Sequence, residues 1–178
     1  MNSSKLILCF LCFSLKVTQA EASSWTIEMP SSVEGLLGSC VVIPCSFDFP
    51  HSDRNAQFTG LWIDVKHHLV YHPVETKILQ QYRNRTGLLG DVRQKSCSLK
   101  IDPLQPRDGG PFHFRVEIPG YDNYSYNEKA IYIILKSELR PITFTLKDVI
   151  EGQRASASCS VSHTCPTSPP AITWSLSV

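Results

Sequence analysis

The chain has 178 residues, of which 42% are apolar and 19% are charged, and its formal net charge is +1. These values are ordinary for a globular protein. They exclude a collagen, a disordered acidic tail and a strongly basic nucleic-acid-binding protein. The unusual number is the cysteine count, which is seven and therefore odd.

The first 20 residues have the pattern of a secretory signal peptide. Lys5 supplies positive charge, the apolar run LILCFLCFSL follows it, and Ala20 is a small residue suited to cleavage. This run is too short to span a bilayer as a helix. Removal of residues 1–20 takes away Cys9 and Cys12, and the other five cysteines remain in a secreted chain, where disulfides are expected.

The rest of the chain contains short apolar or alternating segments separated by Gly, Pro, Asp and Asn. Segments with the pattern of β-strands lie at 40–47, 58–65, 97–102, 112–118 and 130–136. No segment has the periodicity of a long amphipathic helix. Several short strands joined by turn residues predict an all-β sandwich.

The layout of the first cysteine-containing segment recurs near the end of the chain. In both copies a Glu-Gly pair precedes a strand with a cysteine, and a tryptophan follows. Trp62 is 17 residues after Cys45, and Trp174 is 15 residues after Cys159. This internal repeat predicts two immunoglobulin-like domains in tandem.

We expect residues 21–138 to form a variable-type immunoglobulin-like sandwich. Residues 139–178 are then the start of a second, constant-type domain. About 40 residues is near the lower limit for independent folding. We therefore expect the sequence to be the N-terminal fragment of a longer receptor, with its membrane anchor in the missing C-terminal part.

The first domain lacks the usual disulfide between strands B and F. Strand F follows Asp108, and Phe114 occupies the position of its cysteine. Cys97 lies upstream, where strand E is expected, and is the partner available to Cys45. Such a disulfide lies within one sheet, and its 52-residue loop corresponds to about 4 kcal/mol of stabilisation in the loop-entropy model. The alternative is a decayed immunoglobulin domain with incidental cysteines.

Two further cysteines remain to be paired. Cys40 precedes Cys45 by five residues, an odd number, so the two side chains are expected on opposite faces of the strand. A disulfide between Cys40 and Cys165 would join the two domains. It leaves Cys159, the strand-B cysteine of the second domain, to pair with a residue beyond Val178.

The cysteines and strand F together resemble the sialic-acid-binding immunoglobulin-like lectins, the sialoadhesin family. Members have an intrasheet B–E disulfide, an interdomain disulfide and a strand-F motif of the form Y/F-x-F-R. The resemblance covers residues 25–174, and the combined set of motifs is far more specific than any one of them. The matching segments are CVVIPCSFDFP (40–50), LLGD (88–91), CSLKI (97–101) and RDGGPFHFR (107–115).

Strand F also contains the first candidate binding residue. Its apolar residues alternate and must face the core with Phe114, which places Arg115 on the exposed side. A planar guanidinium can hold a carboxylate through two parallel hydrogen bonds. The resemblance implies that Arg115 binds the carboxylate of sialic acid. The alternative is an arginine paired with a neighbouring acid such as Glu117.

The resemblance also implies an aromatic part of the sialic-acid site. Trp25 matches a first-strand tryptophan that contacts the N-acetyl methyl group, for which an indole ring is a suitable apolar face. Its alternative role is partial burial against the sheet. Tyr124 matches the strand-G aromatic residue that packs on the glycerol side chain, with backbone groups of Asn123 and Ser125 beside it. Neighbouring tyrosines leave this register open by a residue or two.

Other residues are expected to serve the scaffold. Trp62 is the expected core tryptophan of strand C, and Arg85 with Asp108 fits the salt bridge at the base of a variable domain. The segment 66–79 contains three histidines without a matching set of carboxylates or cysteines. We therefore expect no metal site and no cofactor.

Two N-glycosylation sequons lie beyond the signal peptide, at Asn84 and at Asn123. The second overlaps the proposed site. We expect Asn123 either to be unglycosylated or to carry a glycan that points away from Arg115.

The chain contains no GxSxG, HExxH, phosphate loop or paired-carboxylate pattern, so it is not expected to be an enzyme. We expect a lectin and adhesion receptor that reaches the plasma membrane through the secretory pathway, or is soluble if this fragment is the whole product. Its partners are sialylated glycoproteins or glycolipids, not nucleic acid. The alternative is an immunoglobulin-family adhesion receptor that binds a protein without sialic acid, through a buried patch of about 800 Å².

Overall fold

The computed structural model describes residues 24–50, 57–138, 142–147, 150–152, 154–166, 168–169 and 171–175. The signal peptide expected at residues 1–20 lies outside them. Within the described part, the regular elements are β-strands and three short 3-10 helices, which confirms the all-β prediction. None of these helices is long and apolar enough to cross a membrane.

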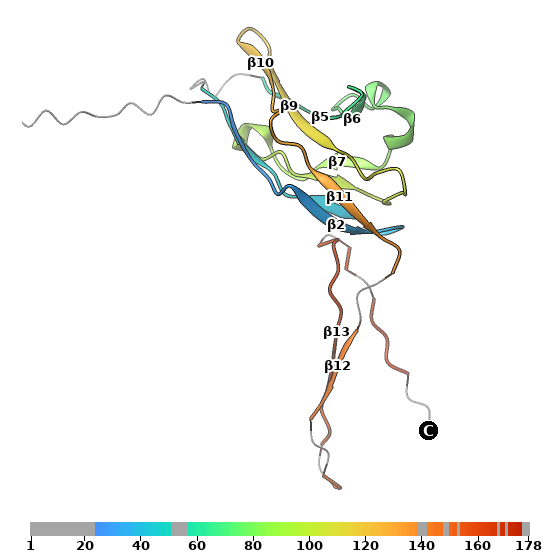
Figure 1. The fold of residues 1–178 in the computed structure, drawn as a ribbon. Coiled ribbons are helices and arrows are strands. Elements are labelled where there is room, and N and C mark those ends of the chain that lie inside the picture. The colour runs from blue at the N-terminus through green and yellow to red at the C-terminus, as the bar shows by residue number, and fades with distance from the viewer. Residues whose placement is uncertain are drawn as a thin grey trace, which may run out of the picture.

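The sheet that carries the candidate site has the strand order β10-β9-β5-β6. All its neighbouring strands are antiparallel. Because β9 lies between β10 and β5, both of its edges are hydrogen-bonded, and β10 forms an edge of the sheet (Figure 1). The strands are β5 (Thr59–Asp64), β6 (Leu69–Tyr71), β9 (Phe112–Ile118) and β10 (Asp122–Ser125).

The other strands of the sandwich form three smaller groups. Strands β3, β8 and β7 pair in that order, β1 pairs with β4, and β2 runs parallel to β11. Their bounds are β1 (Thr26–Glu28), β2 (Ser32–Leu36), β3 (Val41–Ile43), β4 (Ser46–Asp48), β7 (Thr86–Leu88), β8 (Leu99–Ile101) and β11 (Tyr132–Lys136). The short helices are η1 (Glu75–Lys77), η2 (Gln80–Tyr82) and η3 (Val92–Gln94).

The core lies between the sheets and is built around Trp62 and Phe114, both of which have no exposed surface. Their ring centroids are 5.8 Å apart, and Phe47 lies 5.0 Å from Phe114 on its other side. Gly60 allows this close packing, because a Cβ atom there would lie 2.7 Å from Val92 Cγ1 and 3.1 Å from Phe114. Phe114 thus fills the space that a disulfide between strands B and F would cross.

The disulfide of the sandwich instead joins Cys45 to Cys97, whose Cα atoms are 4.9 Å apart. The Cys97 N–H also donates to the Cys45 carbonyl at 3.0 Å. The Trp62 indole N–H donates to the Cys97 carbonyl at 2.9 Å, and both residues are completely buried. The indole therefore has a hydrogen-bond partner at the disulfide itself, as a buried Trp requires.

A buried ion pair fixes the base of the sandwich. Asp108 is completely buried and accepts from Arg85 Nη1 at 2.7 Å and Nη2 at 3.2 Å, and from the Gln105 N–H at 2.8 Å. A buried carboxylate is tolerated when its oxygens are paired in this way. The pair ties the loop before β9 to the segment before β7.

The C-terminal part begins with a hairpin of β12 (Thr143–Leu146) and β13 (Ala157–Ser160), which extends away from the sandwich (Figure 1). Its rings at Phe144 and Trp174 touch each other, yet both side chains remain more than half exposed. Cys159 forms no disulfide with any residue in the described part of the chain. The domain boundary after residue 138 stays a prediction.

A second disulfide joins Cys40, just before β3, to Cys165. The Thr164 hydroxyl donates to the Cys40 carbonyl at 3.1 Å beside it.

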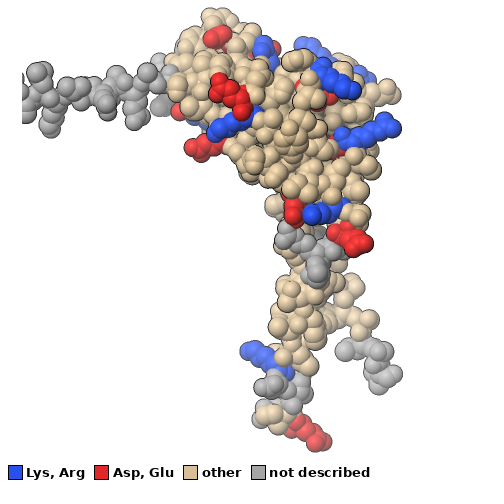
Figure 2. Space-filling model, viewed as in Figure 1, with Lys and Arg blue, Asp and Glu red and all other residues tan. Residues whose placement is uncertain are grey.

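Figure 2 shows acidic and basic side chains interspersed over the visible face of the sandwich, in keeping with the small net charge.

The double substitution Cys45→Ala/Cys97→Ala should lower the free energy of unfolding by about 4 kcal/mol, because the unfolded chain regains the freedom of the closed loop. Urea denaturation under non-reducing conditions measures this difference. Cys159→Ala is the matched control and should leave the urea midpoint unchanged. Equal stability of the double variant and the parent chain would contradict a structural role for this disulfide.

Candidate functional site

Arg115 lies on the outer face of the β10-β9-β5-β6 sheet. It pairs with Leu61 of β5 on one side and with Ser125 of β10 on the other. Its chain neighbours Phe114 and Val116 are fully buried, whereas the Arg115 side chain is 28% exposed. The alternation along β9 thus presents one cation to solvent beside an edge strand.

The guanidinium of Arg115 is held from two sides. Nε donates to Glu117 Oε1 at 3.0 Å, and Nη1 donates to the Ser125 hydroxyl at 2.9 Å. Nη2 makes no hydrogen bond to any residue that the structure describes. Since a guanidinium has five N–H donors in a fixed plane, donors on Nη1 and Nη2 remain for a ligand.

This geometry contains the ion pair with Glu117 that the sequence left as an alternative. The pair does not use up the guanidinium, because Glu117 occupies only the Nε side. Two anchors at fixed angles also reduce the rotamer freedom that a long side chain would lose on binding. Arg115 is therefore pre-oriented with its Nη groups toward β10.

The aromatic residues form a separate cluster at the same edge. Trp25 and Tyr124 are stacked, with centroids 4.7 Å apart and ring planes 6° from parallel. Tyr126 packs edge-on against Tyr124 at 4.9 Å. Trp25 and Tyr124 are only partly buried, so part of the apolar surface of this stacked pair is open to solvent.

Tyr126 supports this surface from below. It is 3% exposed, and its hydroxyl donates to the Asp48 carbonyl at 2.7 Å. Burial raises the pKa of the Tyr126 hydroxyl well above its usual value, with the nearby Tyr124 and Asp48 adding to the effect. Sequence left the strand-G register open among neighbouring tyrosines. Tyr126 is internal, whereas Tyr124 is half-buried and Tyr121 is exposed, so the ligand role of Tyr124 stays a prediction.

A groove of about 160 Å³ runs along the cluster. Its rim is polar, because Lys129 Nζ reaches across it to donate to the Ile27 carbonyl at 2.8 Å. The residues that line it are Trp25, Thr26, Ile27, Tyr124, Tyr126, Glu128 and Lys129.

The structure brings the expected site residues together in two contacting pairs. Arg115 contacts Ser125, and Trp25 contacts Tyr124. Register places Asn123 opposite Glu117 and Ser125 opposite Arg115, whereas Tyr124 pairs with the buried Val116. The two pairs therefore flank β10 and are joined through its backbone. The Ser125 hydroxyl, for which sequence suggested only a backbone role, is an Arg115 partner.

One residue of β9 departs from the expected alternation. His113 shares the Arg115 face but is only 8% exposed. The His67 ring, in the turn between β5 and β6, lies edge-on at 6.4 Å. Burial lowers the pKa of His113, with a smaller contribution from His67 that Asp64 opposes. The alternation of residues along β9 could not predict the burial of His113, because the neighbouring His67 lies in a turn that is distant in sequence.

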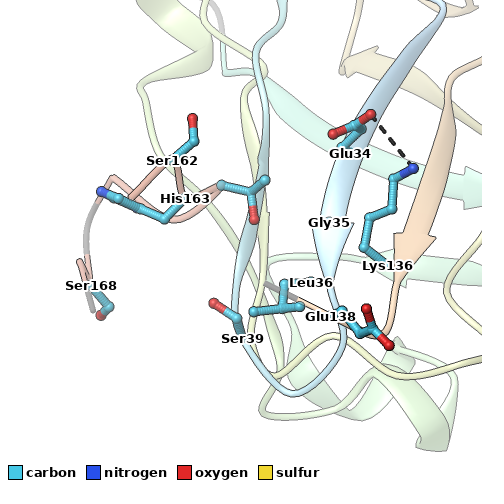
Figure 3. A pocket seen from close by; sticks show the side chains of 10 residues that line it. Glu34, Gly35, Leu36, Ser39, Lys136, Glu138, Ser162, His163 and Ser168 are labelled. Atoms are coloured by element: carbon cyan, nitrogen blue, oxygen red, sulfur yellow. Dashed lines mark ion pairs between the residues drawn. The ribbon is translucent and has the colours of Figure 1, made fainter. Parts of the chain in front are cut away.

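A second groove, of about 190 Å³, lies between the segment after β13 and the strands β2 and β11 (Figure 3). Glu34 and Lys136 form an ion pair of 3.8 Å across the two strands, and His163 lies on the opposite wall. None of the expected ligand-binding residues lines this groove. Among the described residues there is no group of three potential metal-binding side chains.

Curated proteins of about 30% identity match more than nine tenths of this chain. Myelin-associated glycoprotein of Rattus norvegicus is 31% identical over 168 residues, which cover 91% of this chain and 26% of that protein. Schwann cell myelin protein of Coturnix japonica is 29% identical over 174 residues, or 94% of this chain and 28% of that protein. Sialic acid-binding Ig-like lectin 12 of Homo sapiens is 30% identical over 175 residues, which cover 92% of this chain and 29% of that protein. No family model matches the chain.

The sandwich with its intrasheet disulfide defines an immunoglobulin-like β-sandwich protein. The chain is similar to the sialic-acid-binding immunoglobulin-like lectins and to myelin-associated glycoprotein over about nine tenths of its length. It spans about a quarter of the length of these curated relatives.

The buried histidine predicts a pH dependence of stability. The folded-state pKa of His113 lies below its unfolded value of about 6.5. Its contribution to stability is therefore present above pH 6.5 and is lost as the pH falls toward the folded-state pKa. We expect the free energy of unfolding to decrease from pH 7 to 5.5, and His113→Gln to make this decrease shallower. Urea denaturation at each pH checks this, with the exposed His163→Gln as control; identical pH profiles for all three proteins would contradict it.

Proposed function

We propose that the chain is the ligand-binding part of a cell-surface lectin that binds terminal sialic acid through the outer face of β9 and the edge strand β10. The observation that carries this proposal is the pre-oriented guanidinium of Arg115, with donors on Nη1 and Nη2 beside an edge strand. A carboxylate matches the fork of such a guanidinium better than any neutral group does. The similarity to a sialic acid-binding Ig-like lectin supports the same ligand.

The remaining groups suit the rest of this monosaccharide. The Trp25–Tyr124 surface offers apolar contact for an N-acetyl methyl group and a glycerol chain. Because β10 is an edge strand, the Asn123 carbonyl and the Ser125 N–H face away from the sheet and are available to sugar hydroxyls. The Asn123 N–H instead donates to Asp122 Oδ1, and the Ser125 carbonyl accepts from the Asn127 N–H. The site thus combines one charge, one aromatic surface and one row of backbone polar groups.

This site recognises its ligand without converting it. A single monosaccharide buries little surface, so the affinity per site is on the order of millimolar, about −4 kcal/mol. Useful adhesion then depends on many copies binding at once. Sialylated glycoproteins or glycolipids of an apposed cell are the proposed partners, and the lectin reaches the surface through the secretory pathway, anchored by a part of the protein that follows this chain.

Arg115→Ala and Arg115→Lys should each weaken binding to a sialylated glycan array at least about tenfold, because neither side chain can form the bidentate pair. The chain is displayed multivalently for this measurement. Arg154→Lys, in the β12–β13 hairpin, is the matched control and should bind like the parent. Sialidase treatment of the array should abolish the parent's signal.

The same experiment separates the lectin from the alternative adhesion receptor with a protein ligand. Binding to cells that survives both sialidase and Arg115→Ala would exclude the lectin and favour recognition of a protein surface.

Tyr124→Phe should keep sialoside binding within about twofold, because the stacking on Trp25 is retained. Tyr124→Ala should weaken it about two- to tenfold, as expected for an aromatic pair worth about 0.5–1.5 kcal/mol. Equal thermal midpoints of the two variants would show that the fold is unchanged. Loss of binding in the Phe variant would contradict an apolar role for the ring.

A further inference from the structure

The strand beside Arg115 carries an N-glycosylation sequon, Asn123-Tyr124-Ser125, along nearly its whole length. Ser125 pairs with Arg115 and Asn123 pairs with Glu117. The hydrogen bond from Arg115 Nη1 to Ser125 Oγ fixes which face of β10 Ser125 occupies. Residues two apart on a strand point to the same face, about 7 Å apart. Asn123 therefore shares the face of Arg115.

Asn123 also has the accessibility that a modification site needs. It is exposed, it lies on an edge strand, and its side-chain amide makes no hydrogen bond within the described part of the chain. The intervening Tyr124 points to the other face, where it stacks on Trp25. A glycan on Asn123 would not disturb this packing.

The orientation of the Arg115 guanidinium decides whether a glycan at this sequon would affect ligand binding. Glu117 holds the Nε side of the guanidinium, whereas the Nη groups lie toward Ser125 and β10. A carboxylate ligand must approach those Nη groups beside the strand that carries Asn123. The register thus opposes the expectation that a glycan there points away from Arg115.

We propose that N-glycosylation of Asn123 closes the site, so that the fraction of molecules lacking this glycan sets the sialic-acid-binding capacity of the protein. This inference rests on the proposed function. The first sugars would be attached two residues, or about 7 Å, along β10 from the Arg115–Ser125 contact and would exclude a ligand of similar size. Regulation would then occur in the secretory pathway, before the protein meets any ligand.

The covalent step is an ordinary glycosyl transfer. The donor is an oligosaccharide linked through its anomeric carbon to a polyprenyl diphosphate. The C1–O bond to the diphosphate breaks, a bond from Asn123 Nδ2 to C1 forms, and Nδ2 loses one proton. The lipid diphosphate leaves with the electron pair, so no oxidant or reductant is needed.

The second sequon supplies a matched control within the same chain. Asn84 is exposed, and its sequon threonine, Thr86, pairs with Ile101 in the β3-β8-β7 sheet. The Thr86 hydroxyl donates to the Val70 carbonyl at 2.7 Å rather than to any part of the candidate site. A glycan on Asn84 should therefore leave ligand binding unchanged.

The test compares the full chain secreted from cultured animal cells with its Asn123→Gln and Asn84→Gln variants. Mass spectrometry of glycopeptides measures occupancy at each sequon, and a multivalent sialyllactose surface measures binding. Glutamine keeps the backbone groups and removes the attachment point. We expect the Asn123-occupied fraction of the parent to bind at least tenfold less than Asn123→Gln, and Asn84→Gln to bind like the parent.

The outcomes separate this inference from the proposed function. If the folded Asn123→Gln variant binds no sialoside, the proposed function itself is wrong. If it binds and the Asn123-occupied parent binds equally well, the function stands and closure of the site is overturned. A parent chain whose Asn123 is unoccupied in the mass spectrum overturns the inference as well.

Discussion

The disulfide between Cys45 and Cys97 connects neighbouring strands of one sheet, and this leaves the space between the sheets to side chains alone. Phe114 occupies that space in contact with Trp62 and Phe47. The buried indole in turn donates to the Cys97 carbonyl, so the covalent link and the core are mutually dependent. Since Phe114 must face inward, the next residue of β9 must face outward. The position of Arg115 follows directly from how the core is filled.

The ion pair with Glu117 orients the Arg115 guanidinium but weakens its attraction for an anionic ligand. The Glu117 carboxylate fixes the guanidinium at Nε but also places a negative charge close to where an anionic ligand would bind. Both side chains are partly exposed, so solvent screens this repulsion. An arginine prepared in this way favours selectivity for a planar carboxylate over tight binding, which suits a receptor that acts through many weak contacts.

Much of this arrangement could be predicted from the sequence because it depends on local periodicity. Alternation along β9 separates Phe114 from Arg115, and the absence of a strand-F cysteine indicates an unusual disulfide. The burial of His113 could not be predicted, since its cover comes from His67 in the β5–β6 turn. The register of Tyr124 and Tyr126 was equally inaccessible, because a hydrogen bond to Asp48, 78 residues away, decides which ring is internal.

The two disulfides lie only five residues apart in the chain, with Cys40 just before β3 and Cys45 just after it. A continuous covalent path therefore runs from Cys165 through the start of β3 to Cys97, without crossing into the sheet that contains Arg115. Tension applied through the C-terminal part would pass along this path into one layer of the sandwich. Load that a bound ligand places on β9 must cross the shared core and the hydrogen bonds between Phe112 and Ile131 before it reaches this path.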